Sequence, residues 1–194
     1  MIIVITPEEI IENETELINE LFQEGLDLLH IRKTFINSED MIDFIQRINS
    51  EFHHQLVLHS HYDLAENFTI SRFHFREIDR QNDLYKSFVD KTISTSVHDI
   101  EIFNELNEDW EYSFISPVFP SISKKGYGEN SMILNDIKKR DNPNVKLMAL
   151  GGINEKNIHK VFENGVDGVA LLGAIWESDE PLNVFKKCRE NVLS

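Results

Sequence analysis

The sequence contains one cysteine, no long apolar run and few basic residues, and each shortage excludes a class of protein. Cys188 is the single cysteine of 194 residues, so no intrachain disulfide can form and the chain fits a reducing, cytoplasmic environment. No run of 18 apolar residues occurs, which argues against a membrane-spanning helix and a membrane partner. Residues 1–6 lack a basic flank and are expected to form a strand rather than a secretory signal.

Positive charge is scarce as well. The chain carries 19 Lys and Arg against 34 Asp and Glu, a formal net charge of −15 at pH 7. This balance argues against a nucleic-acid partner, because binding to nucleic acid depends on clustered cations that displace counterions. An acidic protein that binds a phosphate must gather its few cations, and two pairs do so, Arg32-Lys33 and Lys124-Lys125.

Short apolar segments alternate with helical patterns along the whole chain. We expect strands at 2–5, 26–31, 56–58, 73–75, 92–94, 112–115, 146–150 and 168–172, and helices at 15–24, 39–51, 62–68, 83–88, 99–106, 134–139, 155–164 and 184–192. Eight such units predict an α/β fold, a single (β/α)₈ TIM barrel over residues 1–194, with an open doubly wound sheet as the alternative. Because the chain is short for a barrel, we expect brief helices after the third and fourth strands.

Glycines follow the last two expected strands. Gly151 and Gly152 come directly after the strand at 146–150, and Gly173 follows the strand that ends at Leu172. Glycine lets backbone amides approach an anion closely, and Asn154 is expected to be the N-cap of the next helix. In a (β/α)₈ barrel the last two strand–helix loops often form a phosphate site. The alternative is that these glycines only permit tight turns.

Polar side chains also stand at the ends of the second and fifth expected strands. His30 and Arg32 alternate with Ile31, so both should point into the lumen of a barrel. A guanidinium there needs an anionic partner, which is either a ligand phosphate or a nearby acid. At the end of the fifth strand, Ser96 and His98 either meet a ligand or lie at the start of a helix that a hydroxyl caps.

The loop after the sixth expected strand, residues 116–128, contains prolines, glycines and two lysines, one of them Lys124. Such a loop can close over a site and bring a cation to an anion. Its alternative role is that of a mobile surface loop.

Four segments together resemble the thiamin phosphate synthase/TenI superfamily over roughly residues 2–176. They are His-Ile-Arg at 30–32, Ser-Val-His at 96–98, Ser-Pro-Val-Phe-Pro-Ser with the following Ser-Lys-Lys-Gly at 116–126, and Ala-Leu-Gly-Gly-Ile-Asn with Gly-Val-Asp-Gly-Val-Ala at 149–170. The resemblance implies a (β/α)₈ barrel of thiamin biosynthesis whose partner is a small phosphorylated thiazole. In the synthase branch, aminopyrimidine pyrophosphate loses pyrophosphate with the help of Mg²⁺ and the thiazole nitrogen captures the pyrimidine. The TenI branch tautomerises a carboxythiazole phosphate without a metal.

The strand ends and the resemblance together select candidate site residues. Candidates for phosphate or pyrophosphate binding are Arg32, Ser96, Ser121, Lys124, Gly151, Gly152, Leu172 and Gly173. Candidates for catalysis are His30, His59, His98 and Lys124, with His61 as a further acid or base. Asp79 is the candidate metal ligand.

The sequence also departs from the synthase pattern. His59-Ser60 stands where synthases typically carry Asn-Asp, which leaves Asp79 as a single carboxylate for Mg²⁺, and Thr34 stands at a lysine position. These losses of charge favour the TenI-like tautomerase, although its proton-transfer histidine aligns with Pro117. The alternatives are a thiamin phosphate synthase, for which alone Mg²⁺ is expected, and a non-catalytic binder of a thiamin-related phosphate. Trp176 is a candidate contact in a homo-oligomer.

Overall fold

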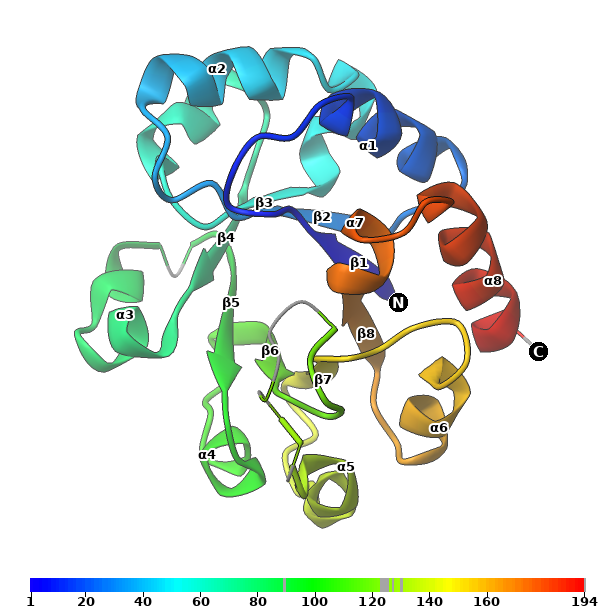
Figure 1. The fold of residues 1–194 in the computed structure, drawn as a ribbon. Coiled ribbons are helices and arrows are strands. Elements are labelled where there is room, and N and C mark those ends of the chain that lie inside the picture. Colours follow the sequence, from blue (N-terminus) through cyan, green and yellow to red (C-terminus); the bar gives the residue numbers. More distant parts are fainter. Residues whose placement is uncertain (89, 123–125, 127, 130, 194) are drawn as a thin grey trace.

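The protein forms a closed barrel of eight parallel strands in a computed structural model that describes residues 1–88, 90–122, 126, 128–129 and 131–193 (Figure 1). The strands pair in sequence order, and the first pairs with the last. They are β1 (Ile2–Ile5), β2 (Leu28–Ile31), β3 (Leu56–Leu58), β4 (Arg72–Phe75), β5 (Thr92–Val97), β6 (Trp110–Ile115), β7 (Lys146–Leu150) and β8 (Gly168–Leu171). The prediction of a TIM barrel is therefore confirmed, and the alternative of an open doubly wound sheet is wrong.

Helices surround the barrel and connect its strands (Figure 1). The α-helices are α1 (Glu14–Gln23), α2 (Ser38–Gln46), α3 (Glu77–Gln81), α4 (Ile100–Asn104), α5 (Ile133–Asp136), α6 (Ile158–Glu163), α7 (Gly173–Trp176) and α8 (Pro181–Leu193). The 3-10 helices are η1 (Ser50–Gln55), η2 (Tyr62–Asn67), η3 (Leu84–Phe88) and η4 (Ile137–Lys139). The connections after β3 and β4 are brief, as predicted, since they consist of η2 and of α3 with η3. Of the helices described, none is long and apolar enough to cross a membrane.

Some boundaries differ from the expected ones. The helix expected at 39–51 ends at Gln46, and the chain then winds into η1. The α-helix after β4 lies at 77–81, ahead of the expected segment 83–88, which forms η3. Strand β5 continues to Val97, beyond the expected end at Ser94, because its serines point toward polar partners across the sheet instead of ending the strand.

The alternation of side chains along each strand produces two apolar layers. One fills the barrel lumen and contains Ile3, Ile5, Leu28, Val57, Tyr112, Phe114, Met148 and Ala170. The other lies between the strands and the helices, and includes Ile31. His30 is fully buried and contacts Tyr112 and Phe114 of the lumen, so the predicted opposite orientations of His30 and Ile31 are confirmed.

Trp176 has a role inside the subunit. Its indole Nε1 donates a hydrogen bond to the Ile5 carbonyl at 2.7 Å, and its ring packs against the outer apolar layer. A buried indole N–H needs such a partner, so this contact attaches α7 to β1. The homo-oligomer stays a prediction.

Candidate functional site

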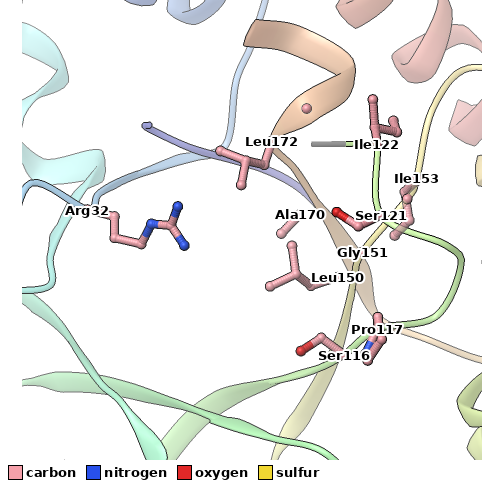
Figure 2. A pocket seen from close by; sticks show the side chains of 12 residues that line it. Arg32, Ser116, Pro117, Ser121, Ile122, Leu150, Gly151, Ile153, Ala170 and Leu172 are labelled. Atoms are coloured by element: carbon pink, nitrogen blue, oxygen red, sulfur yellow. The ribbon is translucent and has the colours of Figure 1, made fainter. Parts of the chain in front are cut away.

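A cavity of about 180 Å³ opens beside the carboxyl ends of β7 and β8 (Figure 2). Six of the predicted phosphate-binding residues line it, namely Arg32, Ser121, Gly151, Gly152, Leu172 and Gly173. The other described residues of the wall are Ser116, Pro117, Ile122, Leu150, Ile153 and Ala170. Apolar side chains combined with a cation and a few polar groups are the usual composition of a pocket for a small charged ligand.

The two glycines after β7 have a steric reason to be glycine. Their φ angles are 106° at Gly151 and 64° at Gly152, a region that favours glycine. A Cβ on Gly152 would lie 2.2 Å from the Pro120 carbonyl oxygen, and one on Gly151 would lie 2.9 Å from the Pro117 Cα. The loop after β6 therefore packs directly onto these glycines, where the Phe119 amide donates to the Gly151 carbonyl at 3.1 Å.

Backbone amides at the cavity remain available to a ligand. Within the described residues, the amides of Gly152 and Gly173 donate no hydrogen bond. Asn154 is not the N-cap of α6, contrary to the prediction: the N-cap is Asn157, whose Oδ1 accepts from the Asn154 amide at 2.9 Å. Because α6 and α7 contain only six and four residues, an anion here would interact with loop amides more than with helix dipoles.

Among the residues that the structure describes, Arg32 supplies the positive charge of the cavity. Figure 2 shows its side chain extending toward Leu150, Ala170 and Leu172. The side chain is 31% exposed, and its Nε lies 3.9 Å from Glu8 Oε1, a weak ion pair at the surface. The Nε atom is itself buried and has no hydrogen-bond partner among the described residues. A buried, unsatisfied guanidinium N–H favours an anionic ligand at this wall.

Lys33 does not join Arg32 as a ligand-binding cation, contrary to the expectation that the pair gathers charge at the site. Its side chain is completely buried, and its Nζ donates to the Pro7 and Glu9 carbonyls and to Glu14 Oε2 at 2.7–2.9 Å. All three ammonium protons have partners. Lys33 therefore fixes the loop after β1 to α1, and Arg32 is the cation of this strand end that reaches the cavity.

Three histidines meet in the lumen beside the mouth of the barrel. His30 Nδ1 lies 2.8 Å from His59 Nε2, and His30 Nε2 lies 2.6 Å from the Tyr112 hydroxyl. The rings of His59 and His74 stack with centroids 4.3 Å apart. Burial lowers the pKa of His74 to about 3 and the pKa values of His30 and His59 well below their usual range, and neighbouring positive groups lower the last two further. The three imidazoles are therefore neutral at physiological pH.

Ser96 and His98 lie outside the main cavity. Together with Arg76 and Ser116 they line a neighbouring recess, and Ser116 borders both spaces. Ser96 caps no helix, since its hydroxyl lies 3.0 Å from His74 Nε2, and the cap of α4 is the Asp99 carboxylate. His98 Nδ1 donates to the Ser116 carbonyl at 2.9 Å, so its Nε2 is the nitrogen left for a ligand.

The Asp79 carboxylate forms an ion pair with Arg76. The Arg76 guanidinium donates from Nε to one Asp79 oxygen at 2.9 Å and from Nη2 to the other at 3.0 Å, and this holds the pKa of the carboxyl below its usual value. The Ser60 hydroxyl, at the expected second metal position, lies 2.9 Å from His61 Nδ1. Mg²⁺ requires oxygen ligands in octahedral geometry. The residues at these two positions do not fit such an ion.

The remaining candidate, Lys124, lies outside the described residues. Sequence reasoning also missed residues that the fold brings to the site, above all His74 and Tyr112. A signal for His74 was present: in Phe73-His74-Phe75 the strand alternation turns the imidazole into the lumen and both phenyl rings outward.

Comparisons with known proteins identify the family and the fold. The family described as "Thiamine monophosphate synthase" matches residues 2–175. A thiamine-phosphate synthase from Clostridium tetani is 25% identical over 182 residues, which cover 90% of this chain and 85% of that protein. The crystal structure of a thiamine phosphate pyrophosphorylase from Bacteroides thetaiotaomicron has a TM-score of 0.79 at 25% identity, with coverage of 98% of this chain and 96% of that one. A thiamine phosphate pyrophosphorylase from Pyrococcus furiosus has a TM-score of 0.77 at 19% identity, covering 99% of this chain and 95% of that one, and shares the fold.

Proposed function

Since the chain belongs to the thiamine monophosphate synthase family, we propose that it binds a phosphorylated thiazole in the Arg32 cavity and acts as a thiamine-phosphate synthase. The reaction would join hydroxyethylthiazole phosphate to aminopyrimidine pyrophosphate and release pyrophosphate. The observation that carries the proposal is the single cavity that unites Arg32 with the glycines after β7 and β8. The names of the relatives favour the synthase over the tautomerase, for which the comparisons give no specific support.

Each part of the cavity has a chemical task in this proposal. The amides of Gly152 and Gly173, which donate to no acceptor among the described residues, would hold the thiazole phosphate, as backbone donors at the last two strand ends of a barrel commonly do. Apolar side chains of Leu150 and Leu172 would keep water away from the reacting carbon, which would otherwise be captured by hydroxide or water.

The pyrophosphate leaving group needs positive charge. Arg32 lines the main cavity and Arg76 lines the neighbouring recess, and Ser116 borders both, so two guanidinium groups lie around the mouth of the barrel. Such groups can stabilise the charge that develops on a departing pyrophosphate. The family typically uses Mg²⁺, but the paired Asp79 and the His59-Ser60 sequence do not fit this ion, and no step is assigned to it.

The tautomerase is the second candidate, and the absence of a magnesium carboxylate pair from this sequence is the observation that favours it. It requires a group that moves a proton near neutral pH. The low pKa values of His30 and His59 make them poor proton donors there, which leaves His61 or His98 for that task. The third candidate is a protein that binds the thiazole phosphate without turnover.

One set of assays separates these functions. Pyrophosphate release and thiamin phosphate are measured with both synthase substrates, with and without Mg²⁺, and isomerisation of carboxythiazole phosphate is followed by NMR in parallel. We expect thiamin phosphate to form, and we expect Arg32→Ala to lower the rate of its formation. Isomerisation without synthesis would select the tautomerase, and calorimetric binding of thiazole phosphate with neither reaction would select the non-catalytic protein. No binding at all would contradict the whole proposal.

A further inference from the structure

The barrel lumen contains a cluster of imidazoles that packing does not explain. The lumen of a TIM barrel is normally filled by Val, Ile and Leu. Here His30 on β2 and His74 on β4 are 0% and 3% exposed, and half-buried His59 follows the carboxyl end of β3. Hydrogen bonds to Tyr112, Ser94, Ser96 and each other offset the cost of burying these rings, but apolar side chains would fill the same space without such partners. Three such rings side by side therefore indicate a purpose other than filling space.

The geometry points to a metal site: we propose that His30, His59 and His74 bind one divalent transition-metal ion of the zinc type through one ring nitrogen each. The three ligand atoms lie within 4.8 Å of one another. Nitrogens around a tetrahedral zinc ion, with bonds of about 2.0–2.1 Å, are separated by about 3.3 Å. His30 Nδ1 and His59 Nε2, at 2.8 Å, are already near this separation, so small side-chain rotations suffice to admit an ion.

The surroundings of the cluster are those of a metal site. A histidine that binds a metal usually gives its other ring N–H to a fixed acceptor, which orients the ring. The other nitrogen of His30, Nε2, contacts the Tyr112 hydroxyl at 2.6 Å. The two nitrogens of His74 contact the Ser94 and Ser96 hydroxyls at 2.9 and 3.0 Å, so either nitrogen can bind the metal while a serine holds the other.

The donor set selects the class of ion. Neutral imidazoles suit Zn²⁺, Co²⁺ and Ni²⁺, whereas Mg²⁺ takes oxygen ligands. Three protein ligands leave a fourth position of a tetrahedral ion open, as in catalytic zinc sites. His59, the partly exposed member, lies at the mouth of the barrel, so the open position would face the same opening as Arg32 and accept water or an anionic oxygen.

Metal binding without substrate tests this inference independently of the proposed reaction. Chelator-treated protein is titrated with Zn²⁺ against a chromophoric competitor, and Co²⁺ is added separately to record its visible absorption bands. We expect one equivalent of Zn²⁺ per chain, intense Co²⁺ bands typical of four-coordinate geometry, and no displacement by a large excess of Mg²⁺.

Histidine variants locate the ion. His59→Ala and His74→Ala should each weaken Zn²⁺ binding at least tenfold, while His159→Ala, which removes an exposed imidazole, should leave it unchanged. If circular dichroism shows that an alanine variant does not fold, His59→Asn, a smaller change at a half-buried position, is measured instead. The inference is overturned when Zn²⁺ fails to bind stoichiometrically, when Mg²⁺ displaces it, or when folded His59 and His74 variants bind it as tightly as the wild type.

Discussion

Among single substitutions, Arg32→Ala is the sharpest test of whether the cavity binds an anionic ligand. The guanidinium extends into the cavity, and its ion pair with Glu8 is long and surface-exposed, so removal should cost less than about 1 kcal/mol of stability. A charge-assisted hydrogen bond to a bound anion contributes about 1.5–3 kcal/mol. Its loss should therefore raise the Kd for thiazole phosphate roughly tenfold to 140-fold, at about 1.4 kcal/mol per factor of ten.

Isothermal titration calorimetry with hydroxyethylthiazole phosphate measures this effect. Arg72→Ala is the matched control, because that side chain is 28% exposed against 31% for Arg32 and pairs with Glu111 at the opposite end of the barrel. Arg32→Lys should fall between wild type and alanine, since lysine keeps the charge but loses the planar fork. Arg32 is not a ligand contact if folded Arg32→Ala binds the ligand as tightly as the wild type, or if Arg72→Ala weakens binding equally.

Three further substitutions test the structural account. Lys33→Met should destabilise the protein by about 3–5 kcal/mol in urea unfolding, because it leaves the Glu14 carboxylate charged and buried. The double variant Lys33→Met/Glu14→Leu should recover most of this loss. If Lys33→Met alone is as stable as the wild type, Lys33 and Glu14 do not form a buried ion pair. Gly152→Ala should cost about 1–3 kcal/mol more than Gly165→Ala, since both have positive φ but only the first meets a loop; equal losses would disprove that contact. Asp79→Asn should be less stable than the wild type above about pH 4. The difference in stability should vanish as the pH falls through the lowered pKa of the native carboxyl, because protonation of Asp79 removes the same ion pair. A difference that grows on acidification would contradict this prediction.

The sequence was sufficient for the parts of the fold that depend on local pattern. Strand alternation placed His30 in the lumen and Ile31 outside it, and the glycines after β7 and β8 marked the strand ends that border the cavity. Both follow from the two-residue period of a strand and from the common direction of parallel strands. The short connections after β3 and β4 followed from chain length.

The parts that were missed depend on contacts between distant residues. His30 meets Tyr112 across 82 residues, and His74 meets Ser94 and Ser96 on the next strand, so the imidazole cluster is visible only after the barrel closes. Lys33 was misassigned because nothing local shows that Glu14, on another element, turns it inward. The pairing of Asp79 with Arg76 is local, but a bidentate pair depends on the backbone turn at the start of α3.

A crystal structure with hydroxyethylthiazole phosphate would show whether the Arg32 cavity holds the phosphorylated thiazole. We expect electron density for the phosphate within hydrogen-bond distance of the Gly152 and Gly173 amides, with the thiazole ring between Leu150 and Leu172. Density for the ligand elsewhere on the protein, or an unchanged cavity at a concentration that saturates binding in solution, would contradict this expectation.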